Sequence, residues 1–146
     1  MTADVGGTNA RIALVEADDE RIEILDYRRY PCGQYPSLTT ILSDFVGRQL
    51  DAGQPRAALE RMAIASAGVV LDGEVINSNL PWRISLQELR DTLGLRELHV
   101  INDFAAAAHG TQRLDQSESR LLTPGVAVAE AGPALVIGPG TGLGAA

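Results

Sequence analysis

The sequence has 146 residues, of which 45% are hydrophobic and 21% charged, and its formal net charge is -7. This length is enough for one domain with a hydrophobic core, but not for two complete lobes. The acidic balance argues against nucleic acid and anionic membranes as partners, because no basic stripe is present to meet phosphate groups. We therefore expect neither partner.

The basic residues are all arginine or histidine, because the chain contains no lysine. A Walker A loop, a protein-kinase site and Schiff-base chemistry each need a lysine nitrogen, so these classes are excluded for this chain. If the protein handles ATP, it must do so with glycine turns and carboxylates.

The cysteine content and the N-terminal sequence indicate a cytoplasmic protein. Cys32 is the only cysteine, so it forms no internal disulfide, and zinc sites usually need several Cys or His residues close together. A buried thiol is the expected state of Cys32. The N-terminus shows no apolar run as long as a signal peptide or a membrane span.

The first part of the chain predicts three strands. Residues 3–15 are typical of a hairpin with the turn DVGGTN (residues 4–9), and residues 22–30 form a third strand that Pro31 ends. Paired glycines let backbone N–H groups approach an anion, and Thr or Asn adds a donor. An ordinary Gly-Gly hairpin would look the same, so both interpretations stay open.

The middle of the chain alternates helices with short strands. Ser37 begins a helix whose apolar residues share one face, residues 62–68 form a buried strand of small residues, and a second helix runs from Ser85 to Gly94. Between them, Asn77 and Asn79 precede the only tryptophan, Trp82. Amides and an aromatic face suit a sugar, although a core tryptophan in a turn is equally compatible with this pattern.

An Asn-Asp pair marks a predicted strand-to-helix junction. The β-branched pair Val100-Ile101 leads into Asn102 and Asp103, and a small-residue helix follows at once. Ligands bind at the C-terminal ends of strands in open α/β sheets, but an Asp at a helix start is also a common cap. His109 follows about two helical turns later, so it is not expected to pair with Asp103.

The last residues repeat the strand-and-turn pattern of the first hairpin. Residues 134–146 predict a strand followed by a glycine turn, and Gly140-Thr141 matches the earlier Gly7-Thr8. The same residues satisfy a loose dinucleotide-binding pattern, but no ribose-binding acid follows. Two Gly-Thr turns on either side of a strand-end Asp suit a duplicated fold of the actin and sugar-kinase kind.

Four segments together resemble bacterial ATP-dependent glucokinases. They are DVGGTNAR (residues 4–11), NLPW (79–82), INDF (101–104) and GPGTGLG (138–144), and both their order and their spacing fit. The resemblance implies an α/β fold of the actin-like (ribonuclease H-like) ATPase class, a mixed five-stranded sheet with helices on both faces. It also implies that residues 1–133 are the N-terminal lobe and that residues 134–146 begin a truncated second lobe.

The resemblance further implies transfer of the ATP γ-phosphoryl group to the 6-hydroxyl of glucose, with ATP and Mg²⁺ bound. By position, Asp103 would be the catalytic base, Asn102 and Asn79 would bind the sugar, and Asp4 would lie on the Mg²⁺ side. The ATP phosphates would be held by Asp4, Gly6, Gly7, Thr8, Asn9, Gly138, Gly140, Thr141 and Gly142. We expect a homodimer in the full-length protein and little or no activity from this chain alone.

Two other functions stay open. A non-catalytic sugar-sensing module could keep the fold and the sugar site, although a sensor has no need for the base Asp103. Another member of the actin-like group, such as an acetate kinase or a polyphosphatase, is the other alternative, and Asn79 with Trp82 argues mildly against it.

Overall fold

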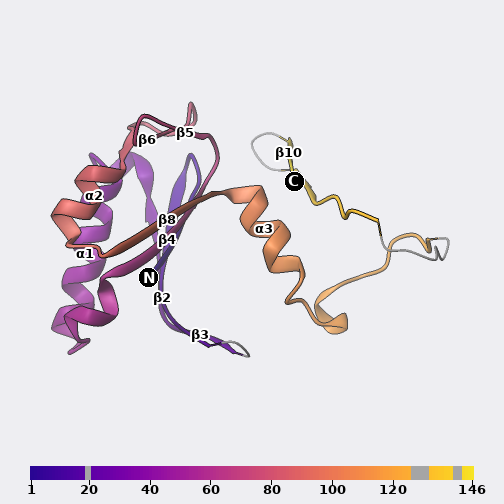
Figure 1. The fold of residues 1–146 in the computed structure, drawn as a ribbon, viewed down its shortest axis with the longest axis horizontal. Coiled ribbons are helices and arrows are strands. Elements are labelled where there is room, and N and C mark those ends of the chain that lie inside the picture. The colour runs from indigo at the N-terminus through magenta and orange to yellow at the C-terminus, as the bar shows by residue number, and fades with distance from the viewer. Residues whose placement is uncertain (19–20, 126–131, 140–142) are drawn as a thin grey trace. The chain divides into compact units, whose positions relative to one another are not determined.

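The computed structural model of the chain describes residues 1–18, 21–125, 132–139 and 143–146 (Figure 1). The chain divides into two compact units, Met1–Asp103 and Phe104–Ala146. The lobe boundary predicted at residue 133 stays a prediction.

The first unit is built on a mixed five-stranded sheet, as the resemblance implies, and its strand order is β3-β2-β1-β4-β8. The strand bounds are Thr2–Val5 (β1), Asn9–Ala17 (β2), Ile22–Pro31 (β3), Arg61–Ser66 (β4) and Glu97–Asn102 (β8). β1, β2 and β3 pair antiparallel, whereas β1, β4 and β8 pair parallel. The predicted first hairpin is therefore confirmed, but its turn is shorter than residues 4–9, because Asp4 and Val5 lie in β1 and Asn9 lies in β2. The predicted third strand is also confirmed.

Two α-helices cover one face of this sheet (Figure 1). Helix α1 (Leu38–Asp51) begins where the Ser37 hydroxyl accepts a hydrogen bond from the backbone N–H of Thr40, and α2 (Leu86–Leu93) ends at Gly94, which has a left-handed backbone. Within this unit both helices lie on the same face, whereas helices on both faces were expected. Their buried side chains pack with those of the sheet into one core, which includes Ile12, Leu38, Ile41, Leu42, Phe45, Ile64 and Leu89.

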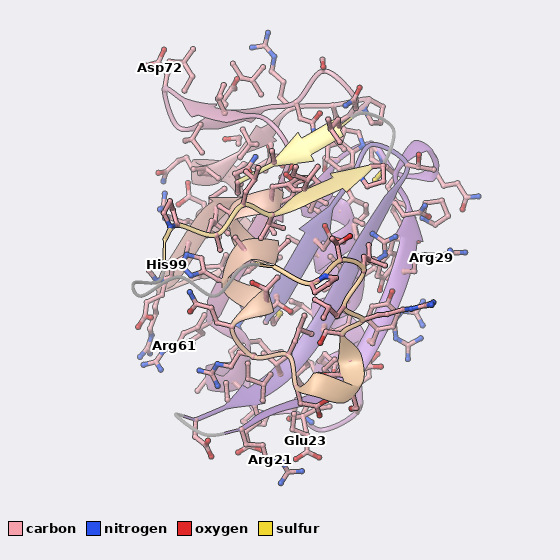
Figure 2. The ribbon with its side chains drawn as sticks, turned by 90° about the vertical axis from the view of Figure 1, so that its right-hand side faces the viewer. Arg21, Glu23, Arg29, Arg61, Asp72 and His99 are labelled. Atoms are coloured by element: carbon pink, nitrogen blue, oxygen red, sulfur yellow. The ribbon has the colours of Figure 1, made fainter. Side chains whose placement is uncertain are left out.

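The remaining elements of the first unit are short. Two 3-10 helices, η1 (Cys32–Gln34) and η2 (Arg56–Leu59), connect the larger elements. A three-stranded sheet is formed by β5 (Val69–Leu71), β6 (Glu74–Ile76) and β7 (Ile84–Ser85). Figure 2 shows Asp72, between β5 and β6, at the end of the unit opposite to Arg21 and Glu23. The small sheet follows β4 directly, so it lies beyond the C-terminal end of that strand.

In the described residues of the second unit, the only sheet is a two-stranded one. Helix α3 (Asp103–Thr111) starts at the boundary, followed by the 3-10 helix η3 (Gln116–Glu118) and a hairpin of β9 (Ile137–Pro139) and β10 (Leu143–Ala145). The strand expected from residue 134 begins at Ile137, which faces Ala145, and two backbone hydrogen bonds between Val136 and Ala146 continue the pairing by one residue.

Candidate active site

The sheet register brings several predicted site residues to one edge. Val5 of β1 is paired with Ser66 of β4, and Ser66 is paired with Asn102 of β8. Because these strands are parallel, their C-terminal ends meet at the same edge of the sheet, where ligands bind in open α/β folds. The first glycine turn and the Asn102-Asp103 pair both continue from this edge.

The first glycine turn is closed by a hydrogen bond of its own and is also bonded by residues of η1. The backbone N–H of Gly6 donates to the carbonyl oxygen of Asn9 at 3.0 Å. From η1, the backbone N–H of Cys32 donates to the carbonyl of Thr8 at 2.9 Å, and its thiol donates to the carbonyl of Gly6 at 3.4 Å. With two carbonyl oxygens of the turn engaged on this side, its shape is fixed. A preformed turn can present N–H groups to an anion without further ordering.

Cys32 itself is fully buried, as expected from the sequence. Burial raises the pKa of its thiol above the ordinary value. The thiol therefore stays protonated at neutral pH and serves as a hydrogen-bond donor. The sequence alone gave no signal for its contact with the glycine turn.

Ser66 is a second support that sequence reasoning missed. Its side chain is 2% exposed, and its hydroxyl lies 3.1 Å from the carbonyl oxygens of both Val5 and Ala67. It thus joins the end of β1 to the end of β4, immediately before the glycine turn. A serine that follows the apolar residues 62–65 was the available signal, since a buried hydroxyl needs a partner.

The segment with Asn79 lies directly against the first glycine turn. A Cβ atom added to Gly7 would be 2.6 Å from the carbonyl oxygen of Asn79 and 2.8 Å from its Cβ atom. Asn79 is exposed, and its backbone N–H donates to Oδ1 of Asn77 at 2.9 Å. A predicted phosphate-side turn and a predicted sugar-side residue are therefore neighbours.

Trp82 anchors the end of this segment to the core. Its indole N–H donates to the carbonyl oxygen of Tyr35 at 3.0 Å, and its partly buried side chain packs against the hydrophobic core. The interpretation of Trp82 as a core residue in a turn is thus supported by its contacts.

The Asn-Asp pair sits at the junction that the sequence predicts. Asn102 is the last residue of β8 and is exposed, whereas Asp103 is the first residue of α3 and is half-buried. The carboxylate therefore lies at the C-terminal edge of the parallel strands, where ligands bind in open α/β folds.

Asp4 is engaged by an arginine from the neighbouring strand. Nη1 of Arg11 lies 2.8 Å from Oδ2 of Asp4, and both side chains are about half exposed, at 48% and 50%. The two residues face each other in the β1-β2 ladder. Among the residues that the structure describes, no group of three or more His, Cys, Asp or Glu side chains could hold a metal ion. A single carboxylate is compatible with Mg²⁺, which usually takes its other ligands from phosphate and water.

The second glycine turn is only partly described. Gly138 lies in β9, opposite Gly144 of β10, whereas Gly140, Thr141 and Gly142 lie outside the described residues. Within the second unit, the ring of Phe104 lies against this hairpin, since a Cβ atom at Gly138 would be 2.8 Å from it.

No helix in the described ranges is long and apolar enough to cross a membrane.

The mixed sheet, with a glycine turn and an Asp at its C-terminal edge, has the actin-like ATPase fold found in sugar kinases. The model of the glucokinase family matches residues 1–146, so this chain belongs to the glucokinase family.

Individual relatives agree with the family. A glucokinase-like protein from Xylella fastidiosa (strain 9a5c) is 45% identical over 150 residues, covering 100% of this chain and 42% of that protein. A glucokinase from Paramagnetospirillum magneticum is 36% identical over 146 residues, covering 99% of this chain and 42% of that protein. The crystal structure of a glucokinase from an Antarctic psychrotroph has a TM-score of 0.77 at 33% identity, covering 99% of this chain and 44% of that one. The chain thus spans 42% of the length of these two curated relatives.

Proposed function

We propose that the full-length protein is an ATP-dependent glucokinase, which converts glucose to glucose 6-phosphate. The observation that carries the proposal is the shared sheet edge, where the first glycine turn, the segment with Asn79 and the Asn102-Asp103 pair come together. A phosphate-binding turn beside a carboxylate and amide side chains is the set of groups that phosphoryl transfer to a sugar hydroxyl needs.

In this proposal Asp103 is the base. Its carboxylate takes the proton of the glucose 6-hydroxyl as the oxygen bonds to the γ-phosphorus, and the bond from that phosphorus to the β-γ bridging oxygen breaks to release ADP. Asn102 and Asn79 hold sugar hydroxyls through their side-chain amides, which can both donate and accept hydrogen bonds. These groups orient the acceptor toward the phosphate.

The phosphates are assigned to the two glycine turns. The first turn contributes Gly6, Gly7, Thr8 and Asn9, and the second contributes Gly138, Gly140, Thr141 and Gly142. Because the Gly6 N–H closes the first turn on the Asn9 carbonyl, the other donors of that turn are proposed to meet the ATP phosphates. Asp4 lies on the side of Mg²⁺, which neutralises phosphate charge when bound. An exposed carboxylate two positions before the first turn fits this role.

The chain is proposed to act only as part of a longer protein. Because it spans 42% of the length of its curated relatives, we expect the 146 residues alone to be inactive. The full-length protein is proposed to be a cytoplasmic homodimer.

A coupled assay of ADP release tests the proposal on the full-length protein, with glucose and with other hexoses. We expect glucose-dependent turnover, and a loss of roughly a hundredfold or more in kcat for Asp103→Asn, since a general base contributes at least that much. Asp51→Asn is the matched control, because Asp51 is exposed at the end of α1. Binding of glucose without turnover would reject the kinase and leave the sugar-sensing module.

A further inference from the structure

The segment that carries Asn77 and Asn79 lies across the ends of two parallel strands. At the end of β4, Gly68 has a φ of +107°, and a Cβ atom there would collide with the carbonyl oxygen of Ile76. At the end of β1, a Cβ atom on Gly7 would be 2.6 Å from the carbonyl oxygen of Asn79. Real Cβ atoms do not approach backbone oxygens so closely, so both glycines are needed for the segment to lie where it does.

The two glycines of the first turn differ in what they require. A Cβ atom on Gly6 would meet only the carbonyl oxygen of Asn9, at 3.6 Å, which is an ordinary van der Waals contact. Neither Gly6 nor Gly7 has a positive φ. The backbone conformation therefore allows a side chain at both positions. The surrounding atoms leave room for a Cβ atom only at Gly6. Close approach by Asn79 is the reason for glycine at position 7.

Asn77 fixes the same segment from within. Its Oδ1 atom accepts the backbone N–H of Asn79 at 2.9 Å, the hydrogen bond of an Asx turn. Its Nδ2 atom is buried and has no partner in the part of the chain that the structure describes. A buried donor without a partner costs stability, which indicates that the side chain is retained for its other contact.

We propose that Gly7 and Asn77 are positioning residues for Asn79, so that the first glycine turn serves the sugar as well as the phosphates. This inference rests on the proposed function, in which Asn79 binds glucose. Gly7 provides the space in which the Asn79 backbone lies, and Asn77 fixes its direction. A phosphate-binding turn that also supports a sugar ligand fixes the sugar hydroxyl relative to the ATP phosphates. Misplacement of either group lowers the rate of phosphoryl transfer steeply.

The test measures glucose binding to the full-length protein by titration calorimetry in the absence of nucleotide. A residue that acts only on phosphate cannot change this value. We expect Gly7→Ala and Asn77→Ala each to weaken glucose binding by roughly tenfold, the effect of one misplaced hydrogen bond of ordinary strength. Gly6→Ala is the matched comparison within the turn and should change the glucose affinity less than about twofold, because its Cβ atom finds space.

Gly33→Ala controls for substitution of an exposed glycine, since a Cβ atom there has nothing within 4 Å. Equal losses of glucose affinity in Gly6→Ala and Gly7→Ala would overturn the inference, as would unchanged affinity in Gly7→Ala. If Gly7→Ala fails to fold, Asn77→Ala decides alone, and unchanged affinity in it overturns the inference. If the wild-type protein phosphorylates glucose, the proposed function holds, and these results count only against the positioning role of Gly7 and Asn77. A wild type that neither binds nor phosphorylates glucose would reject both.

Discussion

The two units of the chain differ in how their apolar side chains are covered. Every buried hydrophobic residue among those described lies in Met1–Asp103, and several there, such as Phe45 and Ile64, are fully buried. In Phe104–Ala146, helix α3 has no buried residue, and Leu122 is 87% exposed. The first unit therefore has its own core, and the described part of the second has none.

This difference separates two ways of holding a site. The strands of the first unit carry the first glycine turn and the Asn-Asp pair, and Asn79 lies against that turn. The core of this unit stabilises the strands, so the geometry of these residues is fixed within the first unit. The second glycine turn belongs to a hairpin whose Leu143 is 76% exposed. Exposed apolar surface is often covered by another part of a protein. In the proposed longer protein we expect other residues to cover side chains such as Leu122 and Leu143.

Core truncation should show the difference most strongly. Phe45→Ala removes a side chain with 0% exposure, and we expect the free energy of unfolding to fall by about 3–5 kcal/mol through lost burial and the cavity left behind. Leu122→Ala, in the second unit, should change it by less than about 0.5 kcal/mol. Urea unfolding followed by circular dichroism measures both. Similar losses in the two variants would show that the second unit shares the core of the first.

A buried hydroxyl that joins β3 to α1 should have the next largest effect. Tyr30 is 5% exposed, and its hydroxyl donates to Oδ2 of Asp44 at 3.0 Å. Arg48 also binds Asp44, so Tyr30→Phe leaves that carboxylate paired, and we expect a loss of about 1 kcal/mol in the free energy of unfolding. Tyr27→Phe, at an exposed position, is the matched control.

The same hydroxyl makes stability depend on alkaline pH. Burial and the hydrogen bond to Asp44 raise the pKa of Tyr30 to about 12, above its ordinary value of 10.0. A pKa raised in the folded state gives stability that is complete below pH 10 and is lost as the pH rises through about 12. The difference in unfolding free energy between wild type and Tyr30→Phe should therefore shrink between these values. A difference that stays constant up to pH 12 would contradict this explanation.

Local sequence patterns predicted most elements of the first unit. The Gly-Gly turn, the cap at Ser37, the stop at Gly94 and the β-branched run before Asn102 each act within a few residues, and the structure has a strand or helix at each place. The short strands β5 and β7 were not predicted, because two or three residues carry too little pattern to distinguish a strand from a turn.

The contacts that shape the site were not predictable in the same way. Gly7 meets Asn79, Cys32 meets the glycine turn, and Ser66 meets Val5, and in each pair the partners are far apart in sequence. Such contacts depend on which strands pair, which periodicity does not determine. The resemblance to glucokinases predicted residues for the site. The residues that hold them in place could be identified only in the folded structure.

The two units also contain contrasting helix caps. Ser37 accepts the backbone N–H of Thr40 at the start of α1, which packs on the core, so we expect Ser37→Ala to cost about 1 kcal/mol. Asp115 caps the short helix η3 of the second unit with a complete capping box. Because the described part of the second unit has no core of its own, we expect Asp115→Ala to leave the urea midpoint of the first unit unchanged. A clear shift of that midpoint in Asp115→Ala would show that the second unit stabilises the first.

The smallest effect on stability is expected for the exposed pair at the start of the sheet. Asp4 and Arg11 are about half exposed, at 50% and 48%, so a double-mutant cycle with Asp4→Asn and Arg11→Gln should give a coupling below about 1 kcal/mol. Turnover should respond differently. If Asp4 lies beside Mg²⁺ in the proposed kinase, Asp4→Asn raises the Mg²⁺ concentration needed for half-maximal activity, whereas Arg11→Gln, which keeps the carboxylate, does not. An equal Mg²⁺ requirement in wild type and Asp4→Asn would remove Asp4 from the metal side and leave it as a surface partner of Arg11.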